Sequence, residues 1–343
     1  MKKILAFLLA ILLIAGLAAC GTDAPVAPTP EPETPTPEAT PEPTPEPQET
    51  EENRVPRAAF ITYSVSNESQ AFAWSEFQRL APEYGFEVYL FAGENDSAIE
   101  VADIEQAIAE GFDAIFVSSG SIEAILPALR RAKEAGIIVG MFNTELPEEH
   151  RDVMDFFVGS DDYMIGELVG QFASDHFPDG ANFVEVGGPA DRPATTARHE
   201  GFRSGIADNI VELGAQNVFI GWNAPEAFVI MEDFIDQFGN DIDIVFCHWD
   251  EGVAGVIEAL QNAGMDDVFV VGIGVDGLGT AEERIRAGTQ ALSIDQNLII
   301  TVRASLENAR IMLEGGTVLV DNWVPADMMT FDTIHNVTSG PNW

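Results

Sequence analysis

Short apolar segments alternate with longer amphipathic segments along most of the chain from Arg57 onward. The apolar segment Ala58–Tyr63 precedes the helix-like segment Ala71–Tyr84, and Ala114–Val117 precedes Ile122–Ala135 in the same way. Apolar strands that each lead into a helix are typical of parallel sheets that are covered by helices on both faces. The alternation therefore predicts an α/β fold.

The chain has 343 residues, which is more than a single hydrophobic core ordinarily contains. The repeated strand–helix units therefore favour two doubly wound parallel-sheet lobes. A closed eight-fold barrel is the structural alternative. The other predicted strands are Glu87–Phe91, Ile137–Phe142, Phe156–Val158, Asn182–Val186, Gln216–Ile220, Ile242–Cys247, Val268–Ile273 and Gln290–Ile294. The other predicted helices are Ala98–Glu110, Met164–His176, Ala194–Asp208, Pro225–Phe238, Gly252–Ala263, Thr280–Ala287 and Asn297–Glu314.

The first twenty residues follow the order of a secretory leader. Lys2 and Lys3 precede an apolar run, Ile4–Leu17, which closes on small residues and Cys20. We expect a signal peptide over residues 1–19, and Cys20 resembles the lipid-modified residue of bacterial lipoproteins. Lipidation of Cys20 would hold the chain on the extracellular face of the cell membrane. A transmembrane anchor is the alternative, although the apolar run is shorter than the roughly 20 residues that a span needs.

Residues 20–56 comprise Cys20 and a predicted tether. From Thr22 to about Pro56, proline alternates with glutamate and threonine, and few side chains could be buried. We expect this segment to be disordered and extended, reaching about 100 Å at roughly 3 Å per residue.

The composition is strongly acidic, with 57 Asp and Glu residues against 16 Lys and Arg residues. Such a surface repels nucleic acid and disfavours anionic ligands, so we expect no nucleic-acid partner. We interpret the acidity as a solubility device that suits a saline or alkaline habitat, where charges are well screened.

The sequence contains no recognisable catalytic constellation. Its five histidines show no metal-ligand spacing, and Cys247 lies in an apolar strand-like run, which predicts a buried side chain. His248 adjoins Cys247, but neighbours on a strand point to opposite faces. Gly272–Gly277 matches the pattern G-x-G-x-x-G after a predicted strand, a pattern that can indicate a dinucleotide-binding site. In this chain we interpret the glycines as a tight turn that presents Asp276. We expect neither an enzyme nor a cofactor or metal site.

Ligands of open α/β sheets bind beyond the carboxyl ends of the strands. The predicted strand ends are rich in Ser, Asn, Asp and Trp, which suits a neutral hydroxylated ligand, because polar groups bond hydroxyls and aromatic faces cover ring C–H groups. These strand ends are Ser64–Asn67, Ser118–Ser121, Asn143–Glu145, Ser160–Asp162, Gly187–Arg192, Trp222–Asn223, His248–Asp250, Asp276 and Asp295–Gln296.

The segments that follow one another from Arg57 to Asn336 resemble those of the periplasmic sugar-binding proteins of ABC importers, especially the ribose-binding type. The same fold forms the ligand cores of LacI-type repressors, which the leader excludes. The motifs that carry the resemblance are Ser64-Val65-Ser66-Asn67 with Phe72, Val158-Gly159-Ser160-Asp161-Asp162, Thr195–Phe202 with Arg198, Val270-Val271-Gly272 through Asp276, and Ser293-Ile294-Asp295-Gln296.

Four positions depart from the family pattern. Asn143-Thr144 stands where an Asp-Arg pair is usual, Trp249 stands in place of an Asn before Asp250-Glu251, and Ser118 stands where the ribose binders carry Asn. The departures argue against ribose itself and leave a pentose, hexose, polyol or nucleoside open. Asp250 and Glu251 read as helix-capping and dipole-compensating groups.

The resemblance implies two lobes, over residues 57–160 with 297–323 and over 161–296 with 324–338, hinged near Ser160, Gln296 and Trp323. It implies a monomeric receptor that delivers ligand to an ABC permease. A sensor ectodomain that serves a membrane kinase or chemoreceptor is the alternative. We expect Arg198 to be held by Asp161 or Asp276, and core packing is the alternative role for Trp222 and Trp249. The candidate ligand-binding residues are Ser64, Asn67, Phe72, Ser118, Asn143, Thr144, Asp161, Arg198, Trp222, Trp249, Asp276 and Gln296.

Overall fold

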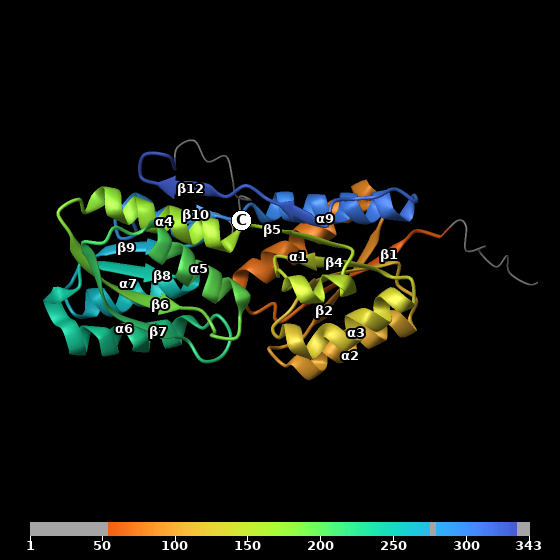
Figure 1. The fold of residues 1–343 in the computed structure, drawn as a ribbon, viewed down its shortest axis with the longest axis horizontal. Coiled ribbons are helices and arrows are strands. Elements are labelled where there is room, and N and C mark those ends of the chain that lie inside the picture. The colour runs from red at the N-terminus through yellow and green to blue at the C-terminus, as the bar shows by residue number, and fades with distance from the viewer. Residues whose placement is uncertain (1–53, 275–278, 335–343) are drawn as a thin grey trace, which may run out of the picture. The chain divides into compact units, whose positions relative to one another are not determined.

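The computed structural model describes residues 54–274 and 279–334 (Figure 1). The predicted leader, Cys20, nearly all of the tether, and Asp276 lie outside these residues. Within the described part, no helix has both the length and the apolar content that a membrane crossing requires.

The first lobe is built on a six-stranded sheet with the strand order β11-β5-β4-β3-β1-β2. Every neighbouring pair in this sheet is parallel. The strands are β1 (Arg57–Thr62), β2 (Glu87–Ala92), β3 (Ala114–Ser118), β4 (Ile138–Phe142), β5 (Phe156–Gly159) and β11 (Asp321–Trp323).

Both faces of this sheet are covered by helices. Ala58 and Phe60 of β1 pack in one core with α1 (Glu68–Leu80) and α9 (Leu298–Leu313). Ala59 and Ile61 pack in the opposite core with α2 (Ser97–Ala109) and α3 (Ile122–Glu134). Because successive side chains of a strand alternate between two buried faces, every position must be apolar, which explains the unbroken apolar runs of the sequence.

The second lobe has a six-stranded sheet in the order β12-β10-β9-β8-β6-β7, in which only the β10–β12 pair is antiparallel. One core lies under α6 and α7 and the opposite core under α4 and α5, on the two sides of the strands in Figure 1. The elements are β6 (Ala181–Gly187), β7 (Ile210–Asn217), β8 (Ile244–Cys247), β9 (Phe269–Gly272), β10 (Leu292–Asp295), β12 (Asp327–Thr330), α4 (Asp162–His176), α5 (Pro193–Gly205), α6 (Ala224–Phe238), α7 (Asp250–Asn262) and α8 (Gly279–Ala287).

The two α/β lobes confirm the predicted fold class, and the eight-fold barrel is wrong. The chain crosses between the sheets three times: from β5 into α4, from β10 into α9, and from β11 into β12. Ser160 Oγ donates to the Gln296 carbonyl at 3.1 Å, so the first two crossings touch.

Several predicted elements were displaced. The strand placed at Gln216–Ile220 is wrong, because β7 covers Ile210–Asn217. This edge strand is mostly exposed and reads IVELGAQN, so it lacks the apolar run that marks a buried strand. Residues Ala81–Tyr84 form a separate 3₁₀ helix, with Pro82 in its first turn, instead of ending α1. The short strands β11 and β12 were not predicted.

Candidate functional site

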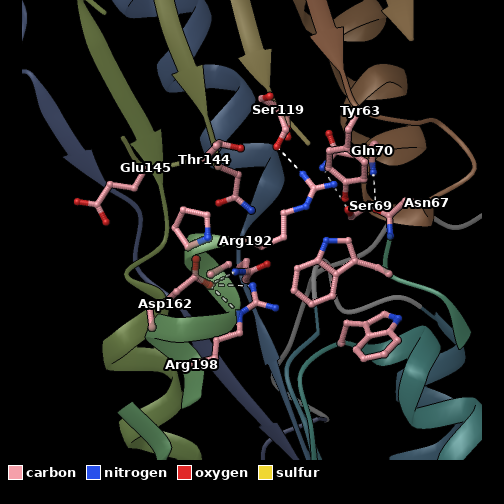
Figure 2. Close-up of a pocket in the computed structure, with 18 of the residues that line it drawn as sticks. Tyr63, Asn67, Ser69, Gln70, Ser119, Thr144, Glu145, Asp162, Arg192 and Arg198 are labelled. Atoms are coloured by element: carbon pink, nitrogen blue, oxygen red, sulfur yellow. Dashed lines mark hydrogen bonds and ion pairs between the residues drawn. The ribbon is translucent and has the colours of Figure 1, made fainter. Parts of the chain in front are cut away.

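A pocket lies where the carboxyl ends of strands from both sheets meet (Figure 2). Its lining includes most of the candidate residues: Asn67, Ser118, Asn143, Thr144, Asp161, Arg198, Trp222, Trp249 and Gln296. It also includes Tyr63, Ser69 and Gln70, which the sequence did not single out. Further lining residues lie in the predicted strand ends but were not candidates, namely Ser119, Glu145, Asp162 and Arg192, and Glu251 was interpreted as a dipole-compensating group.

Arg198, on α5, is almost fully buried in this pocket. Its Nε donates to Asp162 Oδ1 at 2.8 Å, and its Nη1 donates to the His248 carbonyl at 2.6 Å. Its guanidinium also lies over the Trp222 ring, 5.2 Å from the centroid. The described partner is Asp162, so the expected partner Asp161 is wrong, and Asp276 lies outside the described residues. Figure 2 shows Arg198 and Asp162 joined at one wall.

Close packing of α4 against α5 fixes the position of Arg198. A Cβ atom added to Gly166 of α4 would lie 2.3 Å from the Arg198 carbonyl oxygen. One added to Gly201 of α5 would lie 2.0 Å from the Tyr163 carbonyl oxygen. Only glycine permits backbones to approach this closely. The helix pair therefore presents Arg198 and Asp162 as one rigid unit.

Asp161 and Gln296 complete this side of the pocket. Asp161 caps α4, with Oδ1 accepting from the Met164 backbone N–H at 2.9 Å. Gln296 Nε2 donates to Asp162 Oδ1 at 3.3 Å, and Gln296 is 1% exposed. Asp162 therefore receives donors from both Arg198 and Gln296, which keeps its carboxylate oriented.

Two tryptophans form the aromatic part of the lining. Trp222 and Trp249 meet edge to face, with ring centroids 5.6 Å apart. Trp249 is 1% exposed and belongs to a hydrophobic core cluster, so it both packs in the core and lines the pocket. A Cβ atom on Gly188 would lie 2.3 Å from the Trp222 ring, so this indole needs glycine beside it.

Arg192, which precedes α5, reaches from the second lobe to the first. Its Nη1 donates to the Ser119 carbonyl at 2.6 Å, and its guanidinium lies 4.7 Å from the centroid of the Tyr63 ring. Figure 2 shows the guanidinium between Tyr63 and Ser119. Arg192 lies in the predicted strand end Gly187–Arg192, but nothing in the sequence indicated its partner, which is 73 positions away.

The first-lobe loop that receives Arg192 is held by Glu100, a buried residue of α2. Glu100 accepts from Ser119 Oγ at 2.5 Å and from the Gly120 backbone N–H at 3.0 Å. Burial raises the pKa of Glu100, against the lowering effects of these bonds and of Arg192. A Cβ atom at Gly120 would lie 2.6 Å from the Glu100 carboxylate, so the loop requires glycine there.

Glu251 makes the second contact between the lobes. Its Oε1 accepts from Asn67 Nδ2 at 3.3 Å and from the Glu68 backbone N–H at 2.9 Å. The first turn of α7 therefore touches the first turn of α1. Burial raises the pKa of Glu251 to about 7. The expectation that Glu251 only compensates its own helix was therefore incomplete.

Asp250 differs from its neighbour, because it is buried inside the second lobe. Its carboxylate accepts from Gln290 Nε2 at 2.9 Å and from Ser293 Oγ at 2.8 Å. Trp249 occupies the N-cap position of α7, so Asp250 is not the predicted cap. A Cβ atom at Gly274 would lie 2.2 Å from the Asp250 carboxylate, which accounts for a glycine in this turn.

Two of the described candidate residues, Phe72 and Ser64, do not line the pocket. Phe72 is buried in the core between α1 and its sheet, because it lies on the sheet-facing side of the helix. Ser64 is turned to Ser66, with their hydroxyl oxygens 2.7 Å apart. Asp276 lies outside the described residues. Asn143 lines the pocket, but its Oδ1 accepts from the Ser160 backbone N–H at 3.3 Å, so its amide also supports the crossing.

The site lacks the means for nucleophilic chemistry at Cys247. Burial raises the pKa of the Cys247 thiol to about 12, so it stays protonated at neutral pH. His248 Nε2 is 2.8 Å from Glu185 Oε1 and therefore engages a carboxylate inside the lobe. Among the described residues, no group of His, Cys, Asp and Glu side chains could hold a metal ion.

Buried polar atoms at the pocket are left without hydrogen bonds by the residues that the structure describes. They include two donors, Arg192 Nε and Trp249 Nε1, and one acceptor, Gln296 Oε1. Buried donors and acceptors are normally paired. These three atoms have almost no accessible surface in the described conformation, so they do not face the pocket space directly.

Sequence comparison identifies the class of protein. The model of the family described as Periplasmic binding protein domain matches residues 58–317. The Ribose import binding protein RbsB of Bacillus subtilis is 26% identical over 238 residues, covering 69% of this chain and 75% of the relative. The xylitol-binding protein of Mycolicibacterium smegmatis is 28% identical over 245 residues, covering 71% of this chain and 67% of the relative.

Solved structures share the fold. A solute binding protein of an ABC transporter from Bacillus halodurans, with bound myo-inositol, has a TM-score of 0.77 at 23% identity, covering 84% of this chain and 98% of that one. One from Actinobacillus succinogenes, with bound D-allose, has a TM-score of 0.77 at 21% identity, covering 82% and 99%.

The chain therefore belongs to the family of periplasmic sugar-binding proteins of ABC importers. The related proteins are solute-binding proteins, not enzymes.

Proposed function

We propose that this chain binds a neutral polyhydroxylated molecule, a sugar or a polyol, in the pocket between its lobes and hands it to an ABC permease. The polar lining of the pocket carries this proposal, because the amide and hydroxyl groups of Asn67, Ser118, Asn143 and Thr144 can both donate to and accept from a ring of hydroxyls. The two tryptophans add apolar faces for the C–H groups of such a ligand. The names of the relatives support the same class, since they bind ribose and xylitol.

The charges of the pocket also favour a neutral ligand. Arg198 is paired with Asp162, and Arg192 with a carbonyl and a ring, so neither guanidinium requires an anion. The chain as a whole has a net charge of −41, which repels anions. A carboxylated or phosphorylated sugar is therefore disfavoured.

Binding would proceed by hinge closure at the three crossings. Arg192 and Glu251 bridge the lobes at the pocket, and these contacts would separate if the lobes swung apart. Ligand would then shift the population toward the closed form. The proposed lobes keep the boundaries 57–160 with 297–323 and 161–296 with 324–338.

We also propose that Cys20 carries a lipid after cleavage of the leader, so that the receptor stays beside its permease. The test is mass spectrometry of the mature N-terminus from membranes of a lipoprotein-processing host, with Cys20→Ser as the control. A diacylated N-terminal cysteine is expected. Recovery of the wild-type protein in the medium, with an unmodified N-terminus, would refute the anchor.

Binding is tested with a thermal-shift panel that contains ribose, xylose, allose, xylitol, myo-inositol and a sugar phosphate, followed by calorimetry. At least one neutral member is expected to bind, and the sugar phosphate is not. Binding of the phosphate alone would overturn the proposed ligand class.

A further inference from the structure

Glu251 is an acidic residue that lines the pocket. The family resemblance did not assign it to the ligand. It projects from the first turn of α7 in the second lobe toward the N-terminus of α1 in the first. Two donors converge on a single oxygen, Oε1: Asn67 Nδ2 at 3.3 Å and the Glu68 backbone N–H at 2.9 Å. A proton on Oε2 would leave both of these hydrogen bonds intact.

The surroundings of Glu251 disfavour a negative charge. The titratable groups that interact with it are Glu68 on α1, Asp250 on its own helix, Cys247 on β8 and Tyr63 after β1. Two charged groups, Arg192 and Arg198, line the same pocket. Both neighbouring carboxyl groups oppose its ionisation.

The two guanidiniums are engaged elsewhere and do not neutralise it. Arg198 pairs with Asp162 and the His248 carbonyl, and Arg192 with the Ser119 carbonyl and the Tyr63 ring. No ion pair of Glu251 occurs among the described residues. The groups that compensate a negative charge are neutral donors: Asn67 Nδ2, the Glu68 backbone N–H and the backbone N–H of Glu251 itself.

We propose that Glu251 enters the closed cleft as a neutral carboxylic acid, so that closure around the ligand takes up a proton from solution. The inference rests on the proposed closure of the lobes around a ligand. In the open form the side chain would face water, and its carboxyl would ionise as an ordinary glutamate. In the closed form the proton on Oε2 supplies a further hydroxyl donor to the pocket.

The sign of the pH dependence follows from linkage. The pKa of Glu251 rises to about 7 in the described conformation, from an ordinary 4.5. A group whose pKa rises on closure favours closure below its open-form pKa, and that contribution is lost as the pH rises through the closed-form value. Ligand affinity is therefore expected to fall between pH 5 and pH 8, by about tenfold or more, because each unit of pKa shift is tenfold.

Calorimetry in buffers of different ionisation enthalpy tests the inference with a neutral ligand from the panel. At pH 6 the wild type is expected to take up about one proton per ligand, and at pH 8.5 almost none. Glu251→Gln keeps an acceptor at the same place but cannot titrate, so its proton uptake is expected to vanish. Glu258→Gln, at an exposed position on the same helix, is the matched control and should retain the uptake. Binding without proton uptake by the wild type would overturn the inference but leave the proposed function standing.

A measurement on the ligand-free protein separates the two proposals. Spin labels at Ala102 on α2 and Glu232 on α6, both exposed, report the distance between the lobes. The wild type is expected to shift toward the shorter distance as the pH falls from 8 to 5, and Glu251→Gln is not expected to respond. An unresponsive wild type would refute the proton-linked closure even if no sugar in the panel binds.

Discussion

Arg192 Nη1 and the Ser119 carbonyl oxygen are 2.6 Å apart, although the two residues belong to strand ends of different sheets. The hydrogen bond joins two residues of the pocket lining, beside the Tyr63 ring. A charged donor thus ties the second lobe to the loop that Glu100 holds from within the first lobe.

Arg192→Ala is expected to weaken ligand binding by roughly tenfold, because one charge-assisted hydrogen bond of the closed form is lost. Melting of the ligand-free protein should change little, since the contact would be absent from an open form. Calorimetry and a melting curve check the two expectations, with Arg130→Ala on the exposed side of α3 as the control. Unchanged affinity would remove Arg192 from the closing contacts.

Arg198→Ala is expected to reduce ligand affinity by about 100-fold or more, as buried arginines at binding hot spots do. It should also lower the free energy of unfolding, because the His248 carbonyl and Asp162 lose a buried donor. Arg198→Lys should rescue little of the affinity, since one ammonium cannot reproduce the planar fork. The exposed Arg303 on α9 provides the control substitution. Wild-type affinity in Arg198→Lys would show that the geometry of the guanidinium is unimportant.

Gly188→Ala is expected to push Trp222 from its position, because the new Cβ atom would lie 2.3 Å from its ring. Ligand binding should weaken, and the tryptophan fluorescence of the ligand-free protein should change. Gly279→Ala is the matched control, because nothing lies within 4 Å of its added Cβ atom. Equal fluorescence and affinity in both variants would mean that Trp222 does not depend on this glycine.

Glu185 supports the pocket from inside the second lobe. Its carboxylate contacts His248 Nε2 at 2.8 Å and Arg203 Nη1 at 2.6 Å. Burial alone would raise the pKa of Glu185, but His248 and Arg203 outweigh it and lower the pKa to about 2. Since the pKa is depressed, its stabilisation is present above the unfolded value near 4.5 and is lost as the pH falls toward 2.

Glu185→Gln is therefore expected to lower the free energy of unfolding by about 3 kcal/mol at pH 7, as removal of one partner of a buried ion pair does. The difference from the wild type should shrink as the pH falls from 5 to 3. Urea denaturation at several pH values measures it, with the exposed Asp233→Asn as the reference. A difference that stays constant with pH would contradict the low pKa of Glu185.

The sequence was sufficient for the architecture because both sheets are buried on two faces. Positions such as Phe60 and Ile61 must both be apolar, and this requirement produced the runs that marked the strands. Strand β7 is different, because most of its residues are exposed and need not be apolar. The strand was predicted too far along the chain because Phe219 and Ile220 are apolar, yet these two residues are 85% and 61% exposed.

The site was predictable only where a residue ends a strand or matches a family motif. Arg198 and Gln296 were found on that basis, and both line the pocket. Arg192 lies in a predicted strand end and Glu251 was interpreted as a dipole-compensating group, but their partners are 73 and 184 positions away. No local pattern could therefore predict that they join the two lobes. Phe72 failed for the opposite reason, because its periodicity along α1 places it in the core.

Small-angle scattering shows whether the two lobes close around a neutral sugar or polyol. The radius of gyration is measured without ligand and at saturation with a ligand that calorimetry has shown to bind. A smaller radius is expected in the bound state, with a scattering profile that matches the described conformation. An unchanged radius of gyration at saturation would contradict closure of the lobes around the ligand. It would mean that the protein is already closed without ligand or stays open with it.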